Sequence, residues 1–186
     1  MIITITGKPC SGKSAVIEYL INKYKFEKFS GGAIFRRIAA ERGVDVLELN
    51  RLNDTSVDKL VDDEIVKLGK ENLEKDIIFD SRTAWHFIPD SFKVFVDVNP
   101  DEQARRLFNS GRDTKETGST LEEAKVALEE RWYLENTRYY EIYGFDNTNP
   151  AVFDLVVDNS NLTIEETGEI IYKAYLKYVE KRKEKA

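Results

Sequence analysis

Short, continuous apolar runs alternate with longer amphipathic segments along the chain of 186 residues. Continuous runs of β-branched and aromatic residues are typical of strands that are buried on both faces of a parallel sheet. These runs are IITIT at 2–6, DIIFD at 76–80, KVFVDV at 93–98 and FDLVVD at 153–158, with FEKFS at 26–30 as a weaker fifth. Since amphipathic segments separate them, the pattern predicts a three-layer α/β/α fold with a five-stranded parallel sheet and right-handed crossovers.

Three segments have the composition of a helix start. Residues 99–102 (NPDE) supply an N-cap, a proline at the first helical position and acids in the first turn. Ser119 with Glu122, and Thr163 with Glu166, match the capping box, in which two side chains satisfy backbone N–H groups reciprocally. We therefore expect a helix to begin at each of these places.

Two regions are predicted to be additions to the sheet. Residues 31–73 have a mostly helical pattern and lie between the second and third predicted strands. Residues 109–119 (NSGRDTKETGS) are polar, contain glycine and have few apolar anchors, so we expect a mobile loop. No repeat or low-complexity linker divides the chain, which predicts a single domain over residues 1–186.

Composition excludes several classes of protein. The formal net charge of −6 argues against non-specific binding to nucleic acid or anionic lipid, because both need a basic surface. No apolar run approaches the roughly 20 residues that span a bilayer. Cys10 is the only cysteine, so no internal disulfide can form, and with a single histidine the usual zinc sites cannot be assembled. We expect a soluble, cytoplasmic protein.

The segment GKPCSGKS lies between the first predicted strand and a helical pattern, and it matches the phosphate-binding P-loop, G-x-x-x-x-G-K-S. Its glycines let backbone N–H groups curl around an anion, and the following helix directs its positive end at the same anion. We expect Lys13 to reach the β- and γ-phosphates of ATP and the Ser14 hydroxyl to ligate Mg²⁺. The predicted ATP-binding residues are Gly7, Lys8, Pro9, Cys10, Ser11, Gly12, Lys13 and Ser14.

The residues after the third predicted strand distinguish between kinds of P-loop protein. The chain has no guanine-reading N-K-x-D segment, which argues against a GTPase switch. Motor-type ATPases place an acidic pair after this strand so that a glutamate activates water, whereas here Ser81 and Arg82 follow Asp80. Arg82 cannot act as a base, but it can bind a second anion. Two phosphate groups that face each other indicate a kinase with a small acceptor.

A stripe of charged residues lies in the last third of the chain. Arg131, Glu135 and Arg138 are spaced i, i+4, i+7, so on a helix they share one face. Alone, such a stripe is more often a solvated face with Arg–Glu pairs. With Arg36 and Arg82 also present, we interpret the four arginines as a basic cleft for the acceptor phosphate and the transferring group. Glu135 would keep the arginines apart, or contact the sugar or base of the acceptor.

Four segments, with their spacing, cover nearly the whole chain: GKPCSGKS, FSGGAIFRRIAAERG, FDSR and ERWYLENTRYYEIYG. Together they resemble the nucleoside monophosphate kinases, and specifically the cytidylate kinase family in its short, archaeal-like form. The resemblance implies a P-loop kinase fold with a helical insertion at about 31–73 that binds the nucleoside monophosphate, and a short lid at about 109–119. It also implies ATP as phosphoryl donor and Mg²⁺ as cofactor. We expect a monomer that has no nucleic-acid polymer and no membrane as partner.

The resemblance assigns roles to further residues. Ser30, Gly32 and Arg36 fall on acceptor-binding positions. Asp80 would orient the water shell of Mg²⁺ or contact the acceptor, and Arg112 in the polar loop would close over the donor phosphates. The expected catalytic residues are Lys13, Arg82, Arg112, Arg131 and Arg138. The expected acceptor-binding residues are Ser30, Gly32, Arg36, Asp80, Arg82, Glu135 and Arg138.

Other chemically interesting residues have plainer interpretations. Arg106 would line the same side as the lid or lie on a helix surface, and both readings remain open. Trp85 and His86 follow the third strand at helix-like spacing and are expected to pack. A group of acids is predicted to be a solvated helical face, part of which borders the acceptor. These acids are Asp58, Asp62, Asp63 and Glu64.

The chain departs from the family pattern at Ser81, where the family has glycine, and at Thr83, where an acidic base-reading residue is sometimes found. Serine resists positive φ angles, and its hydroxyl adds bulk near the acceptor phosphate. The expected reaction is ATP-dependent phosphorylation of a pyrimidine nucleoside monophosphate, CMP or dCMP. The alternatives are a kinase for UMP, AMP or a non-nucleotide metabolite, and a nucleotide-binding regulatory protein without transfer activity.

Overall fold

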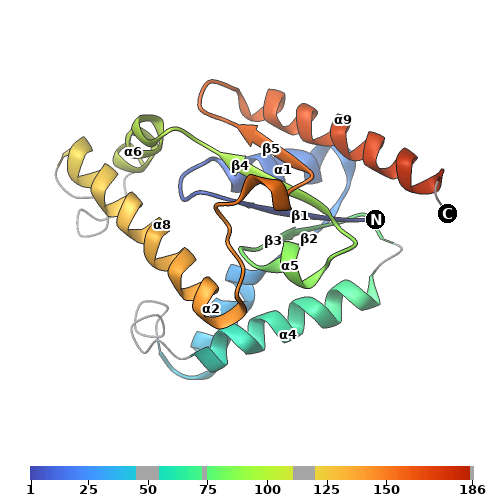
Figure 1. The fold of residues 1–186 in the computed structure, drawn as a ribbon, viewed down its shortest axis with the longest axis horizontal. Coiled ribbons are helices and arrows are strands. Elements are labelled where there is room, and N and C mark those ends of the chain that lie inside the picture. Colours follow the sequence, from blue (N-terminus) through green and yellow to red (C-terminus); the bar gives the residue numbers. More distant parts are fainter. Residues whose placement is uncertain (45–54, 73–74, 111–119, 185–186) are drawn as a thin grey trace.

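The computed structural model of the protein describes residues 1–44, 55–72, 75–110 and 120–184. A five-stranded sheet lies at its centre, in the order β2-β3-β1-β4-β5 (Figure 1). The strands are β1 (Ile2–Gly7), β2 (Glu27–Ser30), β3 (Ile77–Asp80), β4 (Phe92–Asp97) and β5 (Leu155–Asp158). Every neighbouring pair is parallel, so the five predicted strands and the parallel sheet are confirmed.

Helices connect the strands and cover both faces of the sheet (Figure 1). They are α1 (Lys13–Tyr24), α2 (Gly31–Glu41), α4 (Thr55–Glu71), α5 (Ala84–Phe87), α6 (Pro100–Phe108), α8 (Leu121–Tyr143) and α9 (Ile164–Lys183), with a 3-10 turn, η1 (Pro150–Val152). α2 and α4 lie in the segment predicted to be a helical insertion, of which residues 45–54 and 73 are outside the described part. Residues 111–119 of the predicted lid are outside it as well. Within the described ranges, no helix has the length and apolarity needed to cross a membrane.

Strand β1 divides the hydrophobic core into two parts. Ile3 and Ile5 pack with α1 and α9, through residues such as Leu20 and Ile171. Ile2 belongs to a second cluster, formed with α2, α4 and α5. Successive side chains of a strand point to opposite faces, so one short apolar run supports a helical layer on each side of the sheet. The result is the predicted three-layer α/β/α arrangement.

Two of the predicted helix starts are confirmed. Asn99 caps α6, because its side-chain oxygen accepts a hydrogen bond from the Glu102 N–H at 2.8 Å. Helix α9 begins with a complete capping box, in which Thr163 and Glu166 each satisfy a backbone N–H of the other. Local sequence chemistry therefore determines where these two helices begin.

The start of α8 corrects the third prediction. Thr120 is the N-cap, and its hydroxyl accepts a hydrogen bond from the Glu123 N–H at 3.2 Å. The predicted pair, Ser119 with Glu122, is therefore wrong by one residue, and Ser119 itself lies outside the described part. The sequence STLEE contains two cap-forming residues followed by two acids at matching spacing, so the spacing rule fits both registers.

The carboxyl ends of the parallel strands meet at one edge of the sheet. β1 leads there into the predicted P-loop, while β3 ends at Asp80, β4 at Asp97 and β5 at Asp158. Ligands of open parallel sheets bind in the crevice outside this edge. The fold thus brings the phosphate-binding segment together with polar residues from three other strands.

Gly168 allows α9 to pack closely against α1. A Cβ atom at this position would lie 2.4 Å from Cδ1 of Tyr19, whose ring is rigid. We expect Gly168→Ala to lower the free energy of unfolding by about 1–3 kcal/mol, as overpacked core substitutions do. Urea denaturation followed by circular dichroism measures this loss.

Gly69→Ala is the matched control, because its Cβ would meet the flexible Ile88 side chain instead of a ring. Alanine also has a helix propensity about 1 kcal/mol more favourable than that of glycine. The loss in Gly69→Ala should therefore be clearly smaller. Equal losses in the two variants would contradict the close α1–α9 contact as the cause.

Candidate active site

The predicted phosphate-binding segment forms the turn between β1 and α1. Gly7 has a φ of 157°, and a Cβ atom there would lie 2.2 Å from the Val96 carbonyl oxygen on β4, so only glycine fits. Gly12 has a φ of 84° and is the N-cap of α1, without a side-chain hydrogen bond to the helix. The N–H groups at the start of α1 are therefore not capped by a side chain, as an anion-binding helix start requires.

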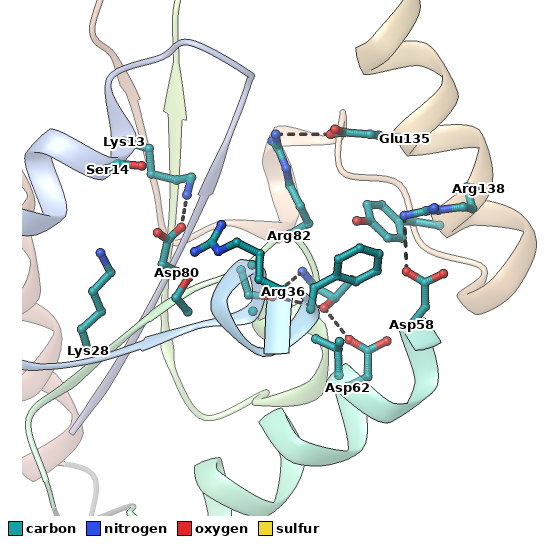
Figure 2. A pocket seen from close by; sticks show the side chains of 18 of the residues that line it. Lys13, Ser14, Lys28, Arg36, Asp58, Asp62, Asp80, Arg82, Glu135 and Arg138 are labelled. Atoms are coloured by element: carbon teal, nitrogen blue, oxygen red, sulfur yellow. Dashed lines mark hydrogen bonds and ion pairs between the residues drawn. The ribbon is translucent and has the colours of Figure 1, made fainter. Parts of the chain in front are cut away.

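A cavity of about 480 Å³ lies beside the start of α1, lined by residues of α1, α2, α4 and α8 and of the ends of β2 and β3 (Figure 2). It brings together most of the residues predicted to bind the acceptor, to act in catalysis or to hold the metal ion. These are Lys13, Ser14, Ser30, Gly32, Arg36, Asp80, Arg82, Arg131, Glu135 and Arg138. Arg112 lies outside the described part, so its role as a lid residue stays a prediction.

Lys13 and Asp80 form an ion pair at one side of the cavity (Figure 2). The Lys13 ammonium donates to Asp80 Oδ1, and both side chains are largely buried. Burial lowers the pKa of Lys13, and the negative charge of Asp80 opposes this shift. The pair therefore holds a lysine side chain at the start of α1, where the P-loop pattern requires one.

Arg82 connects the P-loop to α8. Its Nη1 donates to the Gly7 carbonyl oxygen, and its Nη2 lies 3.2 Å from Glu135 Oε2. Arg131 donates to the other oxygen of Glu135 at 3.0 Å, so a single carboxylate lies between two arginines. The Arg82 guanidinium also lies over the Trp132 ring, 5.8 Å from its centre. These contacts hold Arg82 in one orientation between the phosphate loop and the rest of the cavity.

The other two arginines keep donor groups available. Arg138 Nη2 lies 3.3 Å from Asp58 Oδ1, but its Nε is buried and has no hydrogen-bond partner among the described residues. Arg36 lines the cavity and forms no ion pair or hydrogen bond with another residue of the described ranges. Both side chains can therefore donate to an anion that enters the cavity.

Asp62 of α4 is buried and the Asp58 side chain is largely so, which corrects their prediction as part of a solvated face. Asp62 is 5% exposed, and its carboxylate accepts hydrogen bonds from Thr83 Oγ1 at 2.7 Å and from the Tyr143 hydroxyl. Burial raises the pKa of Asp62. Asp58, the partner of Arg138, is also largely buried. Both acids line the cavity, as predicted for part of this helix.

The spacing of apolar residues along α4 could have indicated that these two acids are buried. Val57, Val61 and Ile65 form its buried stripe, and each acid follows a member of that stripe by one residue. They therefore border the packed face, whereas Asp63 is exposed as predicted.

Further lining residues of the cavity were not predicted as part of the site. They are Lys28, Gly31, Phe35, Val61, Ser81, Thr83 and Tyr139.

Ser81 causes no strain in the turn after β3. Its backbone is not in the positive-φ region. Its hydroxyl accepts hydrogen bonds from the N–H groups of Thr83 at 3.2 Å and of Ala84, the first residue of the short helix α5, at 3.3 Å. A Cβ atom at Gly31 would lie 3.3 Å from this hydroxyl, so the glycine leaves room for it. The backbone strain expected from replacing the family glycine with serine does not arise.

Trp85 and His86 pack against aromatic residues, as predicted. Trp85 is 7% exposed and donates from Nε1 to Asn147 Oδ1 at 2.7 Å. The His86 ring lies 4.7 Å from that of Phe145, and burial lowers the pKa of His86. Neither residue lines the cavity.

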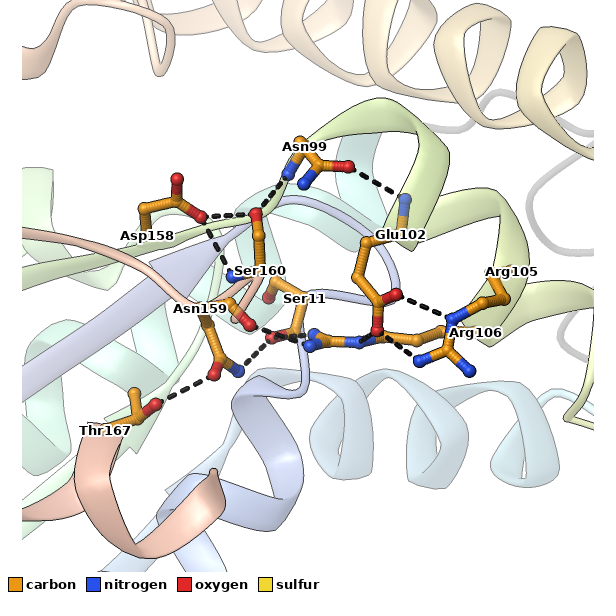
Figure 3. Close-up of polar contacts among 9 residues, drawn as sticks. All are labelled: Ser11, Asn99, Glu102, Arg105, Arg106, Asp158, Asn159, Ser160 and Thr167. Carbon is orange, nitrogen blue, oxygen red and sulfur yellow. Dashed lines mark hydrogen bonds and ion pairs between the residues drawn. The ribbon is translucent and has the colours of Figure 1, made fainter. Parts of the chain in front are cut away.

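Arg106 lies against the P-loop, which excludes a plain surface role (Figure 3). Its Nη1 donates to the Ser11 carbonyl oxygen at 3.0 Å and its Nη2 to the Asn159 carbonyl oxygen at 2.7 Å. Its Nε donates to Glu102 at 2.7 Å. Spacing in the sequence gave no indication that Asn159 is a neighbour of the P-loop.

The side chains beside Lys13 fit a magnesium ion. Ser14 and Asp80 line the same cavity, and Mg²⁺ in nucleotide sites takes one or two protein oxygens and fills its other positions with water and phosphate oxygens. The described residues contain no cluster of three or more His, Cys, Asp or Glu side chains that would form an all-protein metal cage. Ser14 and Asp80 would therefore hold the ion, which neutralises phosphate charge when bound.

Comparisons with known proteins find a matching family model and similar curated proteins. The family model described as an AAA domain matches residues 3–138. The cytidylate kinase of Sulfurisphaera tokodaii is 33% identical over 181 residues, which cover 96% of this chain and 97% of that protein. The cytidylate kinase of Methanocella arvoryzae is 32% identical over 176 residues, with 94% and 96% covered.

Solved structures support the fold alone, because their identities are low. Shikimate kinase from Aquifex aeolicus has a TM-score of 0.59 at 18% identity, over 96% of this chain and 98% of that one. An uncharacterized protein from Eubacterium ventriosum has a TM-score of 0.69 at 15% identity, over 93% and 96%.

The site and the relatives lead to the same conclusion. The site contains a P-loop and a cavity with arginines around it, and the relatives are more than 30% identical over more than nine-tenths of the chain. The chain belongs to the cytidylate kinase family and is a nucleoside monophosphate kinase.

Proposed function

We propose that the protein transfers the γ-phosphoryl group of ATP to CMP or dCMP and releases CDP or dCDP. The observation that carries this proposal is the cavity that has the P-loop lysine on one side and four arginines around it. A site that only hydrolyses ATP has no use for a second set of anion-binding side chains. The relatives named above are cytidylate kinases, which favours a cytidine nucleotide as the acceptor.

On the donor side, the backbone of the P-loop and Lys13 bind the phosphate groups of ATP. On the acceptor side, Arg36 and Arg138 bind the monophosphate, because they have donor groups without partners in the described part of the chain. Arg82 lies between the two sides through its bonds to Gly7 and Glu135. It would stabilise the charge that develops on the transferring group.

An oxygen of the acceptor monophosphate attacks the γ-phosphorus of ATP, the bond to the β-γ bridging oxygen breaks, and ADP leaves. The acceptor oxygen is already anionic, so no strong general base is needed. Ser14 and Asp80 would hold Mg²⁺ beside the phosphates. The contribution of the protein is to align the two phosphate groups and to neutralise their charges.

Asp62 is the residue that favours cytosine over uracil. Its two oxygens accept one hydrogen bond each from Thr83 and Tyr143, and an ionised carboxylate has room for about four. It can therefore accept another from the exocyclic amine of cytosine. The carbonyl oxygen of uracil at the same position would face an acceptor, and a buried acceptor without a donor is costly.

A phosphotransfer panel tests the proposal directly. The assay uses ATP and Mg²⁺ with CMP, dCMP, UMP, AMP, GMP and small alcohols as acceptors, and measures ADP formation. We expect turnover with the two cytidine nucleotides and little with the others. ATP binding without transfer to any acceptor would instead support a regulatory protein, and preference for another acceptor would replace CMP.

Arg82→Ala tests the role of the arginine between the two phosphates. Loss of a fixed charge at the transferring group should lower kcat by roughly a hundredfold or more. Arg105→Ala is the matched control, because Arg105 is largely exposed and lies on α6 outside the cavity lining. Wild-type kcat together with wild-type KM for CMP in Arg82→Ala would rule out this role.

Asp62→Asn tests how the base is recognised. The amide keeps the shape of the carboxylate but can present an N–H donor to uracil, so the ratio of kcat/KM for CMP to that for UMP should fall by roughly tenfold or more. Asp63→Asn removes the same charge from an exposed neighbour and should leave the ratio unchanged. A purely structural role for Asp62 would lower the melting temperature and both activities without altering the ratio.

A further inference from the structure

The P-loop is held from outside by a buried hydrogen-bond network (Figure 3). Asn159 follows β5, is 2% exposed, and donates from Nδ2 to the Ser11 carbonyl oxygen at 2.6 Å. Thr167 on α9 is fully buried and its Oγ1 lies 2.8 Å from Asn159 Oδ1. Arg106 on α6 donates to the same Ser11 oxygen. A single loop carbonyl therefore accepts two hydrogen bonds, from side chains of two other parts of the fold.

The orientation of the Asn159 amide follows from its partners. A carbonyl oxygen can only accept, so Nδ2 must face Ser11 and Oδ1 must face the Thr167 hydroxyl. Arg106 also donates from Nη2 to the backbone carbonyl of Asn159, and Glu102 holds its Nε. The end of β5 and the start of α9 are thus connected to α6 and to the phosphate loop by one closed set of contacts.

Holding the Ser11 carbonyl has a consequence for the next N–H group. In a planar trans peptide the C=O and N–H groups point in opposite directions, and the Ser11 carbonyl shares its peptide with the Gly12 N–H. This N–H meets no acceptor among the residues that the structure describes. The neighbouring Cys10 and Gly12 have φ angles of 56° and 84°, so no regular secondary structure fixes the peptide between Ser11 and Gly12.

We propose that Asn159, oriented by Thr167, is a positioning residue of the donor site, because its amide turns the Ser11 carbonyl outward and so directs the Gly12 N–H toward the donor phosphates. The proposal rests on the function given above, since it assumes that the triphosphate of the donor binds to the P-loop. If the peptide turned over, the Ser11 carbonyl would face phosphate oxygens and repel them. Successive N–H groups that converge on one point are what makes such a loop bind anions.

The test measures phosphate binding without the nucleoside. Isothermal titration gives the Kd for tripolyphosphate and for ATP in the presence of Mg²⁺, and separately the Kd for CMP. Asn159→Asp replaces the donating amide with an oxygen that repels the Ser11 carbonyl, and should weaken tripolyphosphate binding by roughly tenfold or more. Thr167→Val keeps the shape but removes the hydroxyl that orients the amide, and should weaken it by roughly threefold to tenfold. The Kd for CMP should not change in either variant.

Two control variants separate positioning from charge and from stability. Asn161→Asp adds the same negative charge at an exposed position of the same loop, and should bind tripolyphosphate like the wild type. Thr167→Ser keeps the hydroxyl and should restore the binding that Thr167→Val loses. Melting temperatures are recorded for every variant.

Wild-type tripolyphosphate affinity in both Asn159→Asp and Thr167→Val would overturn the positioning role and leave the proposed kinase function intact. Equal losses for tripolyphosphate and CMP would also overturn it, because a general loss of structure would then explain them. A wild-type protein that binds neither tripolyphosphate nor ATP would overturn the donor site itself, and the positioning role with it.

Discussion

The turn between β1 and α1 has to present backbone N–H groups to an anion, which requires that its carbonyl groups be held elsewhere. Three of these carbonyls accept hydrogen bonds from side chains outside the turn. The pairs are Gly7 with Arg82, Pro9 with Gln103, and Ser11 with both Arg106 and Asn159. Among these donors, Arg82 follows β3, Gln103 and Arg106 belong to α6, and Asn159 follows β5. They can surround one short turn only because the parallel order β2-β3-β1-β4-β5 places their strands beside β1 with all carboxyl ends at the same edge.

The charged side chains of the cavity, like the P-loop, are already held in position before a nucleotide binds. The lining contains six cationic side chains and four carboxylates, so it is locally positive in a chain of net charge −6. Cations that are crowded together and partly buried repel one another and lose hydration. Carboxylates relieve this cost in the pairs Lys13–Asp80, Arg82–Glu135, Arg131–Glu135 and Arg138–Asp58. A phosphate that enters the cavity can then take the place of a carboxylate as the partner of an arginine. Because the arginines are already in position, little reorganisation is needed on binding.

Features governed by neighbouring residues could be predicted from the sequence, and features governed by distant contacts could not. The apolar runs predicted all five strands, and the caps of α6 and α9 were found because cap and partner are three residues apart. The cap of α8 was missed by one residue, since STLEE fits two registers. By contrast, the burial of Asp62 depends on Tyr143, 81 residues away, and the support of the P-loop depends on Asn159, 148 residues from Ser11. Spacing rules carry no information over such separations.

The departures from the family pattern at Ser81 and Thr83 belong to one connected group of hydrogen bonds. The Ser81 hydroxyl lies 3.2 Å from that of Thr83, which donates to Asp62, and Tyr143 donates to the other oxygen of Asp62. Asp62, on a helix of the segment between β2 and β3, thus places a carboxylate beside Thr83. Since an unpaired buried carboxylate would be unstable, the hydroxyls of Thr83 and Tyr143 are what allow an acid to stay at this position. In the proposed reaction, recognition of the acceptor then depends on the contacts that Asp62 of α4 makes with Thr83 and with Tyr143 of α8. An acid at 83 would place a second carboxylate beside Asp62, and like charges this close disfavour each other.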